Sequence, residues 1–117
     1  MVTIKKDGAV EAMDLTEMEG VQEVQKEVLI GREEGAPTFV MRRFEVGDEG
    51  QTPYHNHDWE HEVYVLSGKG KVKTEEGPQE VEAGDAVYVP PNENHQFVAV
   101  EPPLRFICLV PNRGELD

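Results

Sequence analysis

The 117-residue sequence has few of the features that cross-link small proteins or direct them to membranes. It contains one cysteine, Cys108, so no disulfide can form within the chain, and a reducing compartment is expected. No apolar run reaches the roughly 18 residues that a membrane-spanning helix needs. Residues 1–20 show no apolar stretch after a basic start, so no secretory signal is expected. We therefore expect one cytoplasmic domain.

Basic residues are scarce as well. Lysine and arginine number 11 against 24 aspartates and glutamates, which gives a formal net charge of −13. Proteins that bind nucleic acid need clustered Lys and Arg to neutralise phosphates, and anionic membrane surfaces attract basic segments. This balance excludes nucleic acid and membranes as partners. We expect most of the surplus acid to lie on the surface, where it aids solubility.

Helical periodicity is nearly absent, and one weak helical turn around Leu15 and Met18 is the only signal. About eight short strand-like segments follow, bounded by Gly, Pro, Asn or Asp, and the clearest are QEVQKEVLI, TFVMRRFEV, VYVL and LRFICLV. Many short strands in a small chain predict an all-β sandwich or closed barrel. We expect this domain over residues 21–113, between an N-terminal extension (1–20) and a C-terminal tail (114–117).

The four histidines have informative positions. His55, His57 and His61 lie within seven residues, and His95 starts a later strand-like segment. Residues two apart in an extended strand point to the same face, so the first two histidines can share one side. Neutral imidazole binds Zn, Cu, Fe, Ni and, less tightly, Mn. The spacing therefore favours metal ligands over isolated surface histidines.

At these residues the chain resembles the cupin superfamily of small jelly-roll β-barrels. The first cupin motif places a Gly before His-x-His, and here Gly50 precedes the HNH of residues 55–57. The second motif corresponds to GDAVYVPPNENH, residues 84–95, with Asn92 where the motif has its second Gly. Asn also adopts left-handed backbone geometry, so this replacement is tolerable. The resemblance implies a single jelly-roll barrel with a metal site inside.

The fourth metal ligand has two candidates, because most cupins carry a glutamate in this part of the motif. Counting back from Gly68 by the motif's six-residue gap reaches His61, whereas counting forward from His57 reaches Glu62. In an extended strand His61 shares a face with Val63, and Glu62 lies on the other face. We expect four histidine ligands: His55, His57, His61 and His95. Glu62 is the alternative to His61.

The string HNHDWEHEVYVL resembles small single-domain cupins with a four-histidine site, which implies manganese and a homodimer. We expect one divalent transition metal per chain, with Mn ahead of Fe, Cu, Ni or Zn. Four neutral imidazoles leave the full charge on the ion, which favours anionic ligands. An octahedral ion would keep two open positions, so the site is expected to bind a small molecule instead of serving only as a structural link.

Five further side chains are expected around the metal. Phe106 and Cys108 share one strand face. The thiol is either near the pocket, with a pKa lowered by metal or Arg, or a small buried hydrophobe. Arg42 falls on an apolar strand face, where it would clamp a carboxylate or pair with a glutamate. Trp59 and Glu60 lie between the histidines and are expected to pack and hydrogen-bond around the site.

Three functions fit these features. The cupin resemblance favours a metal-dependent, dioxygenase-like oxidoreductase that acts on a small, anionic organic molecule. A non-redox metal-dependent lyase or isomerase would use the same ion to polarise an oxygen, although the sequence shows no clear proton carrier for it. A small-ligand-binding domain without turnover is the third alternative.

The edge strands of a small sheet present unpaired backbone N–H and C=O groups that another strand can pair with. The segments VTIKK (residues 2–6) and QEVQKEVLI (residues 22–30) are able to pair with the sheet of a neighbouring copy. Together with the cupin resemblance, this predicts a homodimer.

Overall fold

The computed structural model describes the backbone of residues 2–116 and the side chains of residues 2–114. Its strands are β1 (Met13–Asp14), β2 (Gln22–Ile30), β3 (Phe39–Gln51), β4 (His61–Thr74), β5 (Gly77–Glu82), β6 (Ala86–Val89) and β7 (His95–Pro111). The two short helices in this part of the chain are the 3-10 helix η1 (Arg32–Glu34) and the α-helix α1 (Asn112–Leu116). Neither is long and apolar enough to cross a membrane.

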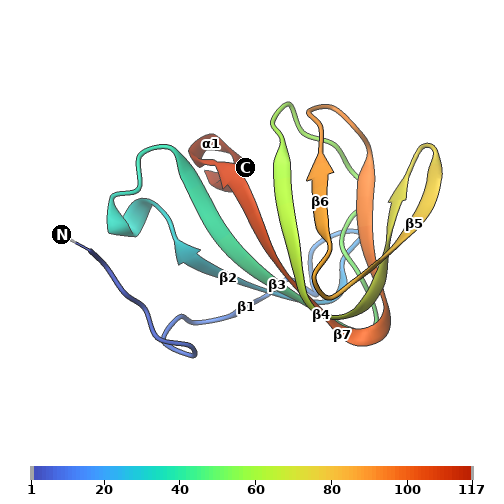
Figure 1. Ribbon diagram of the computed structural model, residues 1–117, viewed down its shortest axis with the longest axis horizontal. Helices are drawn as coiled ribbons and strands as arrows, with labels where there is room; N and C mark the ends of the chain where they lie inside the picture. Colours follow the sequence, from blue (N-terminus) through green and yellow to red (C-terminus); the bar gives the residue numbers. More distant parts are fainter. Residues whose placement is uncertain (1, 117) are drawn as a thin grey trace.

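The strands form one antiparallel sheet in the order β1-β2-β3-β7-β4-β5, with β6 paired to β4. Figure 1 shows that this sheet curls, so that β2 and β3 stand on one side of the molecule and β5 and β6 on the other. The long strands β4 and β7 pair along most of their length and connect the two sides. The predicted all-β, barrel-type domain is confirmed.

Two of the strands are longer than the sequence pattern predicts. The segments SGKG (67–70) and EPP (101–103) are typical of strand ends. The first nevertheless lies inside β4, which is 14 residues long, and the second inside β7, which is 17 residues long. Register shifts in the β4–β7 ladder accommodate these residues as bulges. At Gly68, with φ of +80°, a Cβ would lie 2.2 Å from the carbonyl oxygen of Pro103. Glycine therefore bends the strand here without ending it.

Alternation along the strands places the core. On β4, His61, Val63 and Val65 are buried, whereas Glu62 and Tyr64 between them are exposed. Near the end of β7 every second residue is buried, so the face that Phe106 and Cys108 share points inward: Leu104, Phe106, Cys108 and Val110. Aliphatic residues from β2 and β3 complete this core. The inner face of the barrel is therefore mostly apolar, and the histidines and Arg42 are among its polar exceptions.

The two end segments contact the barrel instead of lying apart from it, although Met1 and Asp117 lie outside the described residues. Met13 of β1 pairs with Lys26 of β2, and Leu15 packs against the core. At the other end, Gly114 of α1 lies so close to the indole of Trp59 that a Cβ would be 2.8 Å from its Nε1. Residues that the sequence places in an extension and a tail thus help to cover the interior.

We expect Gly68→Ala to lower the free energy of unfolding by about 2–4 kcal/mol, because the methyl group would combine left-handed strain with a backbone clash. Gly84→Ala is the matched control, since Gly84 also has a positive φ, +94°, but no atom lies within 4 Å of the place its methyl group would take. Urea unfolding of both variants measures the difference. Equal losses would show that the close β4–β7 contact is not needed.

Candidate metal centre

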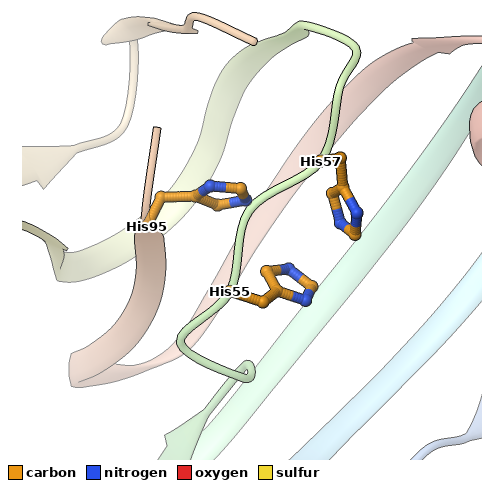
Figure 2. A group of neighbouring side chains, drawn as sticks. All are labelled: His55, His57 and His95. Carbon is orange, nitrogen blue, oxygen red and sulfur yellow. The ribbon is translucent and has the colours of Figure 1, made fainter. Parts of the chain in front are cut away.

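Four histidine side chains meet at one end of the barrel interior. His55 and His57 come from the segment between β3 and β4, while His61 begins β4 and His95 begins β7. Five of the ring pairs have centroids 4.3–6.0 Å apart. Figure 2 shows His55, His57 and His95 arranged around a common space, and their ligating nitrogens lie within 4.8 Å of one another. This spacing suits nitrogen ligands around a single ion.

Backbone hydrogen bonds hold the two histidine-bearing segments together. The His55 N–H donates to the carbonyl of His95 at 3.1 Å, and the His95 N–H donates back to the carbonyl of His55 at 2.9 Å. The Asn92 N–H donates to the carbonyl of His57. Asn92 has a φ of +67°, which confirms the left-handed geometry expected from the motif. These bonds place the rings before any ligand binds.

The ring nitrogens of two histidines show how an ion would be held. His95 Nδ1 lies 2.9 Å from the carbonyl oxygen of Glu93, so its N–H donates there and Nε2 keeps a lone pair for a metal. His61 is 7% exposed, and its Nε2 has no hydrogen-bond partner among the described residues. A buried imidazole nitrogen without a partner is costly, and metal ligation would satisfy it. The residues present therefore fit a divalent metal.

The group of nitrogens within 4.8 Å of one another does not include a nitrogen of His61. The two candidates for the fourth ligand, His61 and Glu62, lie on opposite faces of β4. His61 is buried in the cluster, whereas Glu62 is exposed on the outer face of β4. Buried and exposed side chains also alternate at the two preceding residues, Trp59 and Glu60. Trp59 is buried, with its ring parallel to that of His57 at a centroid distance of 4.5 Å, but Glu60 is exposed. Glu60 therefore does not line the site, because Trp59 and His61 on either side of it point inward.

The histidines open into a central cavity of about 170 Å³. The expected residues Arg42, Trp59, Phe106 and Cys108 line this cavity. Sequence reasoning missed other lining residues: Leu15, Met18, Val21, Val24, Lys26, Phe44, Thr52, Pro53, Phe97 and Gly114. Strand parity was a signal for some of them, because Lys26 shares its parity with Val24, and Phe97 shares its parity with His95.

Cys108 connects Arg42 to the histidine cluster. Arg42 Nη2 donates to Cys108 Sγ at 3.1 Å, and the same sulfur lies 3.3 Å from His61 Nδ1. All three side chains are buried. A sulfur that accepts the Nδ1 proton of His61 leaves Nε2 as the ligating nitrogen. The thiol therefore lines the cavity and contacts a candidate ligand, in addition to filling space in the core.

Burial favours the neutral form of three of the four imidazoles by lowering their pKa values. Loss of hydration lowers the pKa of His55 to about 4, with further contributions from His57 and His95. It lowers the pKa of His61 to about 3, with contributions from His95 and Arg42. Burial also lowers the pKa of His95, although the hydrogen bond to the Glu93 carbonyl opposes this shift. Neutral imidazoles are the form that binds metal, so near neutral pH the site does not have to lose protons first.

Comparisons with known proteins agree with this arrangement. Residues 41–110 match the family described as cupin domain. The polyketide cyclase RemF from Streptomyces resistomycificus is 34% identical over 95% of this chain and 80% of its own, and it superimposes with a TM-score of 0.87. A cupin 2 conserved barrel domain protein from Rhodopseudomonas palustris is 30% identical, with coverages of 90% and 72% and a TM-score of 0.75. No protein with a curated description matches the chain.

We expect the metal-free protein to lose stability as the pH falls from 6.5 towards 5. In this range the unfolded chain protonates histidines that stay neutral when folded, so acid favours unfolding. Each such histidine contributes at most about 1.4 kcal/mol per pH unit. Urea unfolding at several pH values should therefore give a shallower pH dependence for His61→Gln than for the wild type. Identical slopes would contradict the neutral, buried state of His61.

The contact with Cys108 also makes a prediction about metal affinity. Cys108→Val removes the acceptor of the His61 N–H, and a lost partner of a metal ligand typically costs about 10- to 100-fold in affinity. Cys108→Ser keeps an acceptor and is expected to retain most of the affinity. Chelator competition with both variants measures this difference, and equal affinities would show that the sulfur does not orient the ring.

Proposed function

This chain belongs to the cupin domain family, and from that premise we propose that it is an enzyme that depends on one divalent transition metal. Its proposed ligands are His55, His57, His61 and His95. The observation that carries this proposal is the convergence of two buried and two partly buried imidazoles, one of which, His61, has a buried Nε2 without a hydrogen-bond partner among the described residues. Manganese is our proposed ion, on the resemblance to four-histidine cupins, although nitrogen ligands also suit Fe, Cu, Ni and Zn.

For the reaction, we propose first a non-redox conversion of a small organic molecule, as in a cyclase or lyase. The similarity to RemF, a protein described as a polyketide cyclase, favours this class. The bound ion would polarise a substrate oxygen. Two side chains that line the central cavity are suited to move a proton, the thiol of Cys108 and the ammonium group of Lys26. Cys108 is among the side chains that the sequence points to, whereas Lys26 is found in the cavity only from the structure.

The second candidate is a dioxygenase-like oxidoreductase. The resemblance to four-histidine cupins favours it, and an octahedral ion held by four protein ligands would keep two adjacent positions for substrate and oxygen. A small-ligand-binding domain without turnover is the outcome if neither activity is found.

We also propose a homodimer. The N-terminal residues Val2 and Ile4 are 85% and 74% exposed, which is unusual for apolar side chains that alternate as in a strand. The outer edge of β2 is covered by only the two residues of β1 in the described part of the chain. Pairing of this edge and segment with those of a second copy would cover both.

Metal binding is tested with protein purified without a histidine tag. We expect one ion per chain in the wild type and a loss of affinity of at least about 100-fold in His61→Gln, because one ligand is missing. Glu62→Gln is the matched control and should keep the ion, since Glu62 is exposed on the opposite face of β4. Loss of metal in the control, or wild-type affinity in His61→Gln, would contradict the proposed ligand set.

The reaction class is tested by assaying a panel of small keto acids and phenols with and without oxygen. Turnover that persists without oxygen is expected from the non-redox proposal, whereas oxygen uptake coupled to substrate loss would favour the dioxygenase-like one.

The proposed homodimer is tested by light scattering. The measured mass should be twice the chain mass of 13.1 kDa, and a monomer would contradict the proposal.

A further inference from the structure

The central cavity differs in charge from the rest of the protein. The chain carries a formal charge of −13, yet the described residues that line the cavity include two cations, Lys26 and Arg42, and no Asp or Glu. The four histidines beside them are polar and would add the charge of a bound ion. An interior of this kind attracts anions even though the protein as a whole repels them.

Arg42 is the cation that the structure holds most firmly at this place. It is 9% exposed, its Nη2 donates to Cys108 at 3.1 Å, and its guanidinium lies 5.0 Å from the centre of the Phe44 ring. Cys108 Sγ therefore contacts both the guanidinium of Arg42 and the ring of His61. An anionic group bound near the metal would lie in the field of this charge, and arginine suits carboxylates in particular.

The apolar wall of the cavity suggests the shape of the ligand. Phe44 stacks on Phe106 with ring centres 5.3 Å apart and an angle of 20°, and Phe97 stacks on Phe106 at 4.6 Å and 27°. These three rings form a row of similar orientation along the cavity. An apolar cavity of roughly 150 Å³ is known to hold a benzene molecule, so the 170 Å³ here suits a ligand of about one ring.

We propose that this site takes a compact, planar organic anion of about one ring in size, such as an aromatic or enolic carboxylate. Its charged end would face Arg42 and the histidines, and its flat apolar body would lie along Phe44, Phe97 and Phe106. This inference rests on the proposed metal function, because it names the class of substrate that the metal centre receives. The sequence predicts only a small anionic substrate, and this inference adds its size, about one ring, and its planar shape.

Calorimetric titration of the metal-loaded protein tests the proposal with three probes. Benzoate is a one-ring anion, benzyl alcohol is a neutral molecule of the same size, and 2-naphthoate is a larger anion. We expect benzoate to bind at least about 10-fold more tightly than benzyl alcohol, because hydrogen bonds to charged groups are strong when buried. We expect 2-naphthoate to bind more weakly than benzoate. Equal binding of benzoate and benzyl alcohol would overturn the anion class, and tighter binding of 2-naphthoate would overturn the size.

Variants identify the residue responsible. Arg42→Gln should weaken benzoate binding at least about 10-fold and leave benzyl alcohol nearly unchanged. Arg43→Gln is the matched control, since the neighbouring Arg43 pairs with Glu27 at 2.8 Å on the other face of β3. If Arg42→Gln does not fold, Lys26→Met removes the other cation and should lower benzoate affinity by about 3- to 10-fold. Unchanged benzoate binding in the folded variant would overturn the role of these cations.

Metal content, measured on every sample, separates this inference from the proposed function. If the wild type holds one ion per chain and shows no preference for benzoate, the inference fails and the metal function stands. If the protein holds no ion, the metal function fails, and the same titrations on the metal-free protein decide whether the two cations select an anion. Benzoate preference that disappears in Arg42→Gln would then support the anion class without the metal.

Discussion

The reciprocal hydrogen bonds between the backbones of His55 and His95 are the constraint on which the site depends. They join a segment that follows β3 to the start of β7, 40 positions further along the chain. Without them, His55 and His57 would belong to an irregular connection, free to turn their rings towards solvent. With them, both rings face the barrel interior, where β4 adds His61. These hydrogen bonds hold the segment that carries His55 and His57 in place as firmly as a strand. A metal centre requires ligands that are fixed in this way.

The electrostatic design of the interior follows from the same placement. Four rings brought together in a poorly hydrated space cannot all hold protons, because burial and mutual repulsion disfavour the charged form. Arg42 adds to this repulsion while its own guanidinium contacts Cys108. The interior is therefore rich in neutral nitrogen ligands and in positive charge, inside a protein whose net charge is strongly negative. Such a contrast favours anionic ligands at a metal over neutral ones.

Several parts of this picture were predictable from local pattern. Alternation along HEVYVL indicates that His61 faces the interior and Glu62 the outside, and the structure places them so. The same rule indicates that Phe106 and Cys108 share one face of their strand, but which face points inward is known only from the structure. Strand lengths were less predictable, because SGKG and EPP are typical of turns. In the barrel they lie opposite each other, and glycine there permits a bend within a paired strand.

The order of residues is enough to predict the all-β class, the four candidate ligands and the face on which most of them lie, because two-residue alternation is a local property of extended chain. Which distant segments meet is known only from the folded barrel: His55 with His95, Arg42 with Cys108, and Leu15 with the cavity. These contacts depend on the order and register of strands far apart in the chain. Register is set by the packing of the whole sheet, so no short stretch of residues contains it.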